Sequence, residues 1–449
     1  MINKIAVLEE TIIKLAEAKK YASLRDFLTT LNPADIAEAF GAVSDQSLPL
    51  VFRLLPKELA AETFVEMETE QQEILIRGFS DSELKAVVEE LYVDDAVDLV
   101  EEMPANVVSR ILAQADPDTR KMINNILKYP EDSAGSVMTT EMVELQGSMT
   151  AAQAIEHIRR VGVDKETINT CYITGRTHKL KGVISIRSLI LADPDALCQD
   201  LMTPTVVSVN TLEDQETVAQ MFSKYNFNAL PVVDGDNRLL GIVTMDDAMD
   251  IMEEEATEDM EKMAAMTPSD RPYLSTGVFD SFKQRVPWLL ALMIASTITG
   301  WIITGFEDVL MAATVIVAYI PLLMDTGGNS GSQTSVAVIR SLSLQEVEFK
   351  DLFRVIWKEF RVALLCGVPM AGLIFLKILL LDGQSLLVAA AISVSLLCTI
   401  LLAKIVGCSL PMLAKRVGFD PTLLASPIVT TIVDIVSLLI YVLMISVIL

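Results

Sequence analysis

The sequence PTLLASPIVTTIVDIVSLLIYVLMISVIL, at residues 421–449, is long enough to cross a lipid bilayer and carries one charged side chain, Asp434. A membrane-spanning helix needs about 20 predominantly apolar residues. Four further segments of this kind precede it, at residues 286–306, 309–339, 362–376 and 383–403. We therefore expect a five-helix α transmembrane domain over residues 271–449.

Lysine and arginine residues in the short connections predict the orientation of these helices, because such residues stay in the cytoplasm. They gather before the first predicted span and after the second and fourth, at Lys283, Arg285, Arg340, Lys350, Arg354, Lys358, Arg361, Lys404, Lys415 and Arg416. The chain begins without a basic segment followed by an apolar run, so we expect no signal peptide. This pattern predicts a cytoplasmic N-terminus and a C-terminus outside.

The second predicted span contains the polar sequence DTGGNSGSQ, at residues 325–333. A stretch rich in glycine and hydroxyl groups is tolerated at membrane depth only where it lines a cavity or is buried in protein. Close helix packing through small residues would explain the glycines. It would not explain Asp325, Asn329 and Gln333 together, so this stretch is a candidate lining for a polar cavity.

Asp434 is a second polar group at membrane depth, and no lysine or arginine lies near it in the sequence. Acidic residues inside a bilayer are costly and usually functional. The alternative is a protonated or helix-capping aspartate between packed helices. One such residue per chain suits a two-fold dimer, in which two copies of Asp434 would face one ion across the axis.

The chemistry of these groups indicates which ion they would bind. All are oxygen donors, no CxxC pair occurs, and no histidine follows His178. Hard divalent cations choose such sites, and Mg²⁺ gives up its water ligands reluctantly. The lack of histidine also excludes an HExxH metalloprotease or a Ser–His site in the membrane half, and no P-loop is present, so we expect no enzyme.

The net charge of −25 is distributed very unevenly along the chain. Residues 1–270 carry 23 basic and 49 acidic side chains, whereas residues 271–449 carry 12 and 11. This division excludes a single soluble domain. It also argues against a nucleic-acid partner, which would require a basic face. An acidic cytosolic half is suited to attracting cations.

An internal repeat of 24 residues predicts a helical N domain over residues 1–130. Its apolar anchors are Leu31, Leu55, Phe79 and Met103, and each precedes a short amphipathic segment. A period of this length fits two short helices per repeat, stacked as an α-solenoid or superhelix. An irregular helical bundle is the alternative. Acidic clusters in this domain would be either solvated surface or cation ligands.

A second repeat predicts two α/β domains, at residues 131–199 and 200–245. Val137-Met138-Thr139 recurs as Leu201-Met202-Thr203-Pro204, and in both copies an amphipathic helix and two strands follow. With the later sequences NALPVVD and GIVTxxD, these copies resemble a tandem pair of CBS domains. Such pairs resemble nucleotide-binding regulatory modules, although Ser188 stands where the second copy has Asp247.

Residues 246–270 form an acidic connecting segment with helical periodicity. Asp246, Asp250, Glu254 and Glu258 follow one another at steps of four. Like charges at this spacing destabilise an isolated helix, and a bound cation or a basic loop would offset the repulsion. The alternative is a solvated linker helix. Its place directly before the first span favours a coupling role.

With these motifs in view, the whole chain resembles the MgtE family of bacterial magnesium transporters. The domain order matches: helical N domain, CBS pair, acidic connecting (plug) helix and transmembrane pore domain. The motifs that carry the resemblance are EEEATED (253–259), RVPWL (285–289), DTGGNSGSQ (325–333), GFDP (418–421) and SPIVTTIVD (426–434).

The resemblance implies a homodimeric, Mg²⁺-selective, channel-like transporter in the lipid of the bacterial plasma (inner) membrane. Mg²⁺ bound among cytosolic acidic residues would close the pore, because differential binding to one state shifts the population toward it. Asp434 would be the pore ligand for hydrated Mg²⁺, with Asp325, Asn329 and Asp420 as further candidates.

The resemblance also implies regulatory metal ligands and a nucleotide site. The regulatory candidates are Asp247, Asp250, Glu255, Glu258, Asp259, Asp214 and Glu216, with Asp95 and Asp98 from the N domain. ATP is a candidate ligand of the CBS pair, with contacts expected from Tyr172, Arg187 and Phe227. The alternatives are a membrane-tethered CBS sensor or scaffold that transports nothing, and a transporter of another divalent cation such as Co²⁺ or Mn²⁺.

Overall fold

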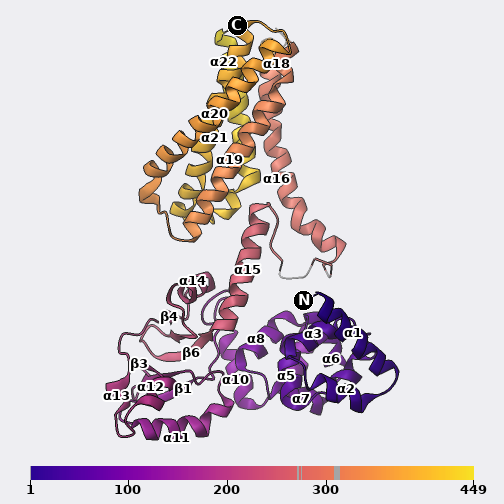
Figure 1. Ribbon diagram of the computed structural model, residues 1–449, viewed down its shortest axis with the longest axis vertical. Helices are drawn as coiled ribbons and strands as arrows, with labels where there is room; N and C mark the ends of the chain where they lie inside the picture. Colours follow the sequence, from indigo (N-terminus) through magenta and orange to yellow (C-terminus); the bar gives the residue numbers. More distant parts are fainter. Residues whose placement is uncertain (1, 270–272, 275, 308–313, 449) are drawn as a thin grey trace. The chain divides into compact units, whose positions relative to one another are not determined.

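The computed structural model describes residues 2–269, 273–274, 276–307 and 314–448. It divides into two compact units, Met1–Met252 and Glu253–Leu449, which are considered separately below (Figure 1). The start of the predicted second span, residues 309–313, lies outside the described residues.

Ten short helices build the first part of the first unit. They are α1 (Ile2–Glu17), α2 (Tyr21–Leu28), α3 (Pro33–Phe40), α4 (Leu48–Phe52), α5 (Lys57–Val65), α6 (Thr69–Gly78), α7 (Asp81–Val88), α8 (Val93–Glu102), α9 (Ala105–Gln114) and α10 (Pro117–Ile126). Alternate helices pack on one another, α1 on α3, α3 on α5, α5 on α7 and α7 on α9. This stacking is the superhelical arrangement that the repeat predicted.

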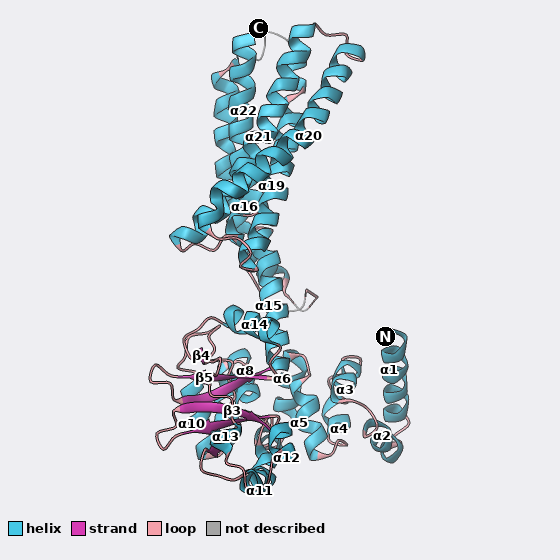
Figure 2. Cartoon of the chain, turned by 60° about the vertical axis from the view of Figure 1, so that its left-hand side comes forward, coloured by secondary structure: helices cyan, strands magenta, loops and turns pink. Residues whose placement is uncertain are grey.

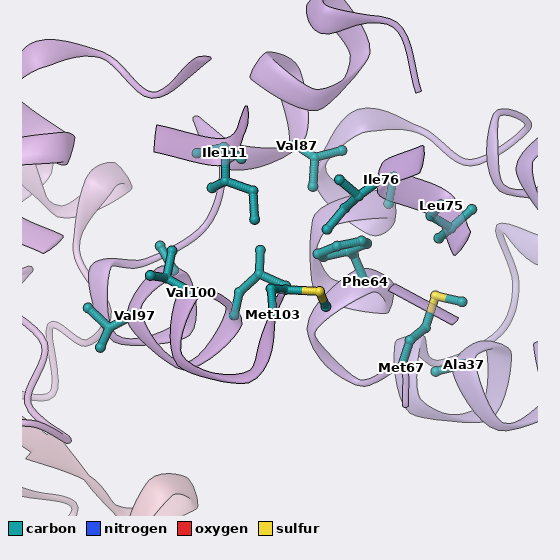
Figure 3. Packing of buried hydrophobic residues seen from close by; sticks show 14 of the residues in the cluster. Ala37, Phe64, Met67, Leu75, Ile76, Val87, Val97, Val100, Met103 and Ile111 are labelled. Atoms are coloured by element: carbon teal, nitrogen blue, oxygen red, sulfur yellow. The ribbon is translucent and has the colours of Figure 1, made fainter. Parts of the chain in front are cut away.

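The 24-residue anchors form the core of this domain. Leu55, Phe79 and Met103 are buried, and Leu31 packs against the same cluster. Figure 3 shows Met103 beside Phe64 and other buried residues of neighbouring helices. Each anchor is followed by a helix start, as at Asn32, whose side chain accepts a hydrogen bond from Ala34 N at 3.1 Å. The period of 24 is therefore the spacing at which helix pairs present apolar residues to one core.

The second part of the first unit contains two three-stranded sheets of the same topology (Figure 2). The first copy comprises β1 (Val143–Gln146), α11 (Ala151–Val161), β2 (Thr170–Thr174), β3 (Leu180–Ser185), α12 (Ile186–Leu191) and α13 (Cys198–Leu201). The second comprises β4 (Val209–Asn210), α14 (Gln215–Tyr225), β5 (Ala229–Val233) and β6 (Leu239–Thr244). In each sheet the first pair of strands is parallel and the second antiparallel. The internal repeat is thus confirmed.

The acidic segment forms one helix, α15 (Met245–Met263). It follows β6 directly. The hydroxyl of Thr244, the last residue of β6, donates hydrogen bonds to the carboxylates of Asp246 and Asp247 in the first turn of α15. The helix begins in the first unit and ends in the second.

The second unit is helical. It contains α16 (Val278–Gly305), α18 (Thr314–Ala318), α19 (Ile320–Ser343), α20 (Leu352–Leu380), α21 (Leu386–Val417) and α22 (Ser426–Ile448). Helix α21 is central, because it packs on α19, α20 and α22, and α19 also packs on α22. In the most apolar stretch of α21, 56% of the residues are buried, against at most 39% in the other apolar helices described.

Within the described residues, four helices are long and apolar enough to cross a membrane: Val278–Gly305, Phe349–Leu380, Leu386–Val417 and Thr422–Val447. Helix α19 has 24 residues, or about 36 Å at 1.5 Å per residue, but it holds the polar stretch and is not among the four. The predicted fifth span therefore depends on α19 and stays a prediction.

The structure corrects the predicted end of the fourth span. We expected this span to end at residue 403, with Lys404 in a cytoplasmic loop. Helix α21 instead continues to Val417, and Lys404 lies inside it and is 6% exposed. The charged side chain can lie inside the bundle because Lys404 has partners on other helices, Glu359 on α20 and Thr334 on α19.

Glycines bring α19 close to its neighbours. A Cβ atom at Gly407 of α21 would lie 2.3 Å from the carbonyl oxygen of Gly331 on α19. A Cβ atom at Gly327 would lie 2.7 Å from Thr399 of α21 and 2.8 Å from Ser437 of α22. The glycines of the polar stretch therefore serve close helix packing, as one of the two explanations predicted.

Candidate functional site

The polar residues of α19 lie on a different face from its glycines. Asp325, Asn329 and Gln333 are spaced by four residues and are all exposed in the single chain, whereas Gly327 and Gly331 are buried. Residues at this spacing share one side of a helix. The second unit thus presents a stripe of carboxylate and amide groups along one face of α19.

Asp434 of α22 lies beside this stripe. A Cβ atom at Gly328 would lie 3.7 Å from Asp434 Oδ1, and the carboxylates of Asp325 and Asp434 are near enough to repel each other. In the described part of the chain, the Asp434 carboxylate has no hydrogen-bond or ion-pair partner. The structure therefore brings Asp325, Asn329 and Asp434 to one place on the α19–α22 pair.

The fourth pore candidate, Asp420, lies elsewhere. It is in the connection before α22, where it accepts hydrogen bonds from Thr422 N at 2.8 Å and Thr422 Oγ1 at 2.6 Å. Lys262 Nζ lies 3.0 Å from Asp420 and 2.7 Å from Glu258 Oε1. Burial raises the pKa of Asp420, but the hydrogen bonds from Thr422 and Lys262 outweigh it and leave the pKa below its usual value. Asp420 is therefore paired with the end of α15 and does not join the Asp434 group.

An acidic cluster lies in the first unit, where α8 faces the start of α15. Burial raises the pKa of Asp95 to about 7, and repulsion from Asp247 adds to the effect. Burial and the charge of Asp95 likewise raise the pKa of Asp98 to about 8. Asp94 is buried, and its pKa is raised well above the usual range for the same reasons. Among the described residues, no lysine or arginine forms an ion pair with Asp94, Asp95 or Asp98.

Asp247 and Glu166 complete the acidic cluster. Asp247 accepts hydrogen bonds from Thr244 N at 3.2 Å and Thr244 Oγ1 at 2.6 Å, but burial still raises its pKa. Burial and repulsion from Asp247 raise the pKa of Glu166 to about 8, and its Oε2 atom is buried without a hydrogen-bond partner. No three acidic groups in the described ranges converge closely enough to form a metal site. The cluster is therefore a buried region of negative potential in which the carboxylates repel one another.

The remaining regulatory candidates have other positions. Asp214 caps α14 by accepting a hydrogen bond from Glu216 N at 2.9 Å. Asp250 lies one turn beyond Asp247 on α15, and its charge also raises the pKa of Asp247. Glu255 and Asp259 lie on the part of α15 that belongs to the second unit, as Glu258 does.

A cavity of about 330 Å³ lies in the CBS pair. Phe227 lines it and stacks on Tyr225 with ring centroids 5.3 Å apart. Tyr172, however, is fully buried in β2 with its hydroxyl unpartnered, and neither Tyr172 nor Arg187 is among the residues that line the cavity. Of the three predicted nucleotide contacts, the structure brings only Phe227 to it. Polar groups around Phe227 come from Thr170, Ser185, Ser188, Thr203, Thr205 and Asn228.

Sequence reasoning missed several residues of these sites. Asp94 belonged to a recognised acidic run, but nothing marked it as the buried member. Glu166 stands alone in a connection, so only the tertiary structure brings it to the cluster. The basic pattern assigns Lys404 to a connection, and no motif singles out Lys262, although each neutralises a carboxylate of another element.

Three family models match separate parts of the chain. The MgtE intracellular N domain matches residues 31–132, the CBS domain matches residues 198–254, and the divalent cation transporter model MgtE matches residues 320–444. These ranges follow the predicted order of domains.

Curated relatives match almost the whole chain. The magnesium transporter MgtE of Thermus thermophilus is 36% identical over 440 residues, which is 96% of this chain and 97% of the relative. The magnesium transporter MgtE of Bacillus subtilis is 31% identical over 436 residues, which is 96% of each chain.

Two solved structures of soluble parts of magnesium transporters each match about half of the chain. The cytosolic domain of the Mg²⁺ channel MgtE in complex with ATP is 36% identical with a TM-score of 0.51, and the match covers 54% of this chain and 99% of that one. The soluble part of a magnesium transporter is 28% identical with a TM-score of 0.53, and the match covers 56% and 99%.

Proposed function

The chain belongs to the MgtE family, whose curated members are magnesium transporters rather than enzymes, and on this premise we propose that it carries Mg²⁺ across the plasma membrane past Asp434. The observation that supports this role most directly is the unpaired Asp434 carboxylate beside the polar face of α19. An unpaired acid at membrane depth is costly unless it faces water or an ion.

The pore lies along α19 and α22. The face with Asp325, Asn329 and Gln333 is uncovered in one chain, and lipid tails would not solvate it. A second copy of the chain, related by a two-fold axis, would enclose this face and place two Asp434 side chains opposite each other. The few carboxylates suit Mg²⁺ that keeps most of its water ligands, since Mg²⁺ dehydrates reluctantly.

Cytosolic Mg²⁺ closes this pore through the acidic residues of the first unit and of α15. Without a cation, Asp95, Asp98, Glu166 and Asp247 repel one another in a buried setting. A divalent cation would remove this repulsion and stabilise the arrangement in which the groups are close. If that arrangement belongs to the closed state, binding shifts the population toward it by linkage.

The second regulatory position is the end of α15, where Glu258 and Asp420 share Lys262. Two carboxylates from different elements that both contact one ammonium group are a suitable pair for a divalent ion in its place. Mg²⁺ at this position would connect α15 to the membrane domain. Glu255 and Asp259, on the same stretch of α15, are the further ligands of this position.

The CBS pair binds an adenine nucleotide in its cavity, with the base on Phe227. Aromatic rings suit this role because every base has a π-face. The relative solved with ATP supports the assignment at 36% identity. Calorimetric titration with ATP tests it, and a Phe227→Ala variant should weaken binding at least several-fold.

Flux into liposomes tests the transport function. The full chain is reconstituted with a Mg²⁺-sensitive dye inside the vesicles, and Mg²⁺ is added outside. Asp434→Asn should reduce the initial rate at least tenfold, whereas Asp280→Asn, which changes a surface acid on α16 paired with Lys283, should leave it unchanged. Equal rates for wild type and Asp434→Asn would reject the pore assignment.

The same vesicles separate the alternatives. Flux of Co²⁺ or Mn²⁺ with no Mg²⁺ flux would favour a transporter of another cation. Absence of all flux, with correct insertion verified by protease protection of the N-terminus, would favour the sensor or scaffold. The protease pattern also tests the cytoplasmic N-terminus that the distribution of basic residues predicts.

A further inference from the structure

A cavity of about 360 Å³ lies in the second unit at the ends of α19 and α21. Its lining comes from the last residues of α19, the following connection, and the last two turns of α21. None of these residues belongs to the Asp434 group or to the contact of α15 with Asp420. The volume falls within the range of small-molecule binding sites, about 300–1,000 Å³.

The floor of this cavity is apolar. Leu342 and Met412 are almost fully buried, and they belong to a hydrophobic cluster that also includes Val347 and Phe349. An apolar floor of this kind does not attract a free inorganic ion, because the ion would lose water without gaining contacts. It suits a ligand that carries hydrocarbon next to a polar group.

The rim of the cavity is basic, and its donors are available. Within the part of the chain that the structure describes, Lys415 Nζ donates one hydrogen bond, to Leu342 O at 2.8 Å, which leaves two ammonium hydrogens to bind an anion. The Arg416 guanidinium lies over the Phe349 ring at 4.2 Å from its centroid. Within the described residues the N–H groups of Arg416 have no hydrogen-bond acceptor. The ring therefore fixes the guanidinium without using its donors.

One acidic residue lines the same cavity, but it is neutralised locally. Glu348 Oε2 lies 2.8 Å from Lys350 Nζ. The rim is therefore left with the two positive charges of Lys415 and Arg416. Charge complementarity favours an anion over a zwitterion or a cation.

The neighbouring helix indicates that this cavity opens at the membrane surface. On α20, Phe353 is 83% and Trp357 is 60% exposed, and Trp357 stacks on Phe360 while Arg361 lies over its ring. Exposed aromatic residues interleaved with arginine and lysine are typical of the boundary between lipid and water. A ligand in the cavity would therefore have a polar end in the headgroup region and an apolar end in the hydrocarbon region.

We propose that this cavity, here called the Lys415–Arg416 pocket, binds the headgroup of an anionic phospholipid, with the phosphate between the two basic side chains. The lipid glycerol and the start of its acyl chains would cover Leu342, Val347 and Met412. Basic pockets between membrane helices bind anionic headgroups in this way. The proposal rests on the chain spanning a membrane and is independent of which ion is transported.

Native mass spectrometry of the full chain in detergent tests the pocket, with phosphatidylglycerol as the probe and phosphatidylcholine as the comparison lipid. Wild type should retain phosphatidylglycerol and bind phosphatidylcholine more weakly. Removing both charges in Lys415→Gln/Arg416→Gln should weaken phosphatidylglycerol binding roughly tenfold or more, since each basic residue near a membrane surface contributes to the attraction. Arg416→Gln alone, which keeps the bond from Lys415 to Leu342, should weaken it roughly threefold or more.

A matched control removes two charges from the same region outside the pocket. Arg354→Gln/Lys358→Gln does so on the exposed face of α20 and should keep wild-type binding within about twofold. Equal loss in this control would overturn the pocket in favour of diffuse surface attraction. Unchanged binding in Arg416→Gln, or equal binding of phosphatidylglycerol and phosphatidylcholine, would also overturn the proposal. No ion gradient is present, so the result does not depend on transport.

Discussion

The ammonium group of Lys404 on α21 lies 3.6 Å from the carboxylate of Glu359 on α20, and the two side chains are 7% and 14% exposed. Lys404 also donates to Thr334 Oγ1 of α19 at 3.1 Å, and this hydroxyl lies 3.1 Å from Glu359. Thr334 directly follows the polar stretch of α19. The ion pair thus fixes the helix that carries Asp325 and Asn329 against two others.

Loss of one partner should destabilise the membrane domain strongly. Lys404→Met leaves Glu359 buried without its counter-charge, and breaking a buried pair in this way costs about 3–5 kcal/mol. We expect a large drop in the temperature at which the protein aggregates in detergent, measured by size-exclusion chromatography after heating. The double variant Lys404→Met/Glu359→Met should recover much of the loss, because no unpaired charge remains.

The control for this prediction is an exposed pair on α20. Arg354→Met removes a partner of Asp351, but Arg354 is 88% exposed, and such pairs contribute little. If Lys404→Met and Arg354→Met have the same thermal stability, the buried pair does not support the packing of α19.

Close packing of α19 on α21 gives a second prediction. Gly407→Ala would place a Cβ atom 2.3 Å from Gly331 O, so the two helices must separate. Overpacking of this kind costs about 1–3 kcal/mol. Gly372→Ala on α20 is a matched control, because its Cβ atom would meet nothing within 4 Å. This control should be neutral or slightly stabilising, as alanine favours helix more than glycine does. A Gly407→Ala protein as stable as the control would contradict the prediction, and thermal unfolding in detergent measures both.

Much of this architecture could be predicted from periodicity. The anchors at Leu55, Phe79 and Met103 are buried where the 24-residue repeat required, and both CBS copies have the same strand order. Repeats are readable because each unit must bury the same face against the next. The limits of the membrane helices were less readable. Lys404 looked like a loop residue because its partners, Glu359 and Thr334, are far away in the sequence.

The candidate sites were readable to different degrees. Asp434 and Asp325 stand out in apolar surroundings, and the structure brings them together. Glu166 has no such signal, since an isolated glutamate in a connection becomes significant only when folding places it near α8. The prediction of Asp420 as a pore ligand rested on a motif alone, and a motif does not show where a side chain points. In the structure, the Asp420 carboxylate points toward Lys262 at the end of α15.

The Lys262 contact gives a third prediction. Lys262→Gln removes the cation between Glu258 and Asp420, so their repulsion should loosen the end of α15 when divalent ions are absent. Hydrogen–deuterium exchange of the full chain should then speed up at residues 253–263 by at least several-fold in chelator. Added Mg²⁺ should restore protection if it takes the place of the ammonium group.

The control here is Lys283→Gln, which removes a similar contact, to Asp280 on α16, at the surface. Its exchange at residues 253–263 should match wild type with and without Mg²⁺. Unchanged exchange of Lys262→Gln in chelator would mean that the contact does not hold α15.

The acidic cluster predicts how stability depends on pH and on Mg²⁺. The pKa of Asp95 is about 7 and those of Asp98 and Glu166 are about 8 in the folded chain, against roughly 4 when unfolded. The folded state therefore binds more protons between about pH 4 and pH 8, and its stability falls as the pH rises through this window. Mg²⁺ competes with these protons, so it should raise the unfolding temperature more at about pH 8 than at about pH 6.

The variant Asp95→Asn/Asp98→Asn/Glu166→Gln tests whether these groups are responsible. Its first-unit unfolding temperature, followed by circular dichroism of the full chain, should lose most of its dependence on both pH and Mg²⁺, because three of the carboxyl groups that would exchange protons for the ion are gone. A matched control, Glu38→Gln/Glu58→Gln/Glu62→Gln, replaces three exposed glutamates of the first unit. That control removes the same charge and should keep the wild-type response. If both triple variants keep it, Mg²⁺ stabilises the chain at another position, and the Glu258–Asp420 pair becomes the site to vary.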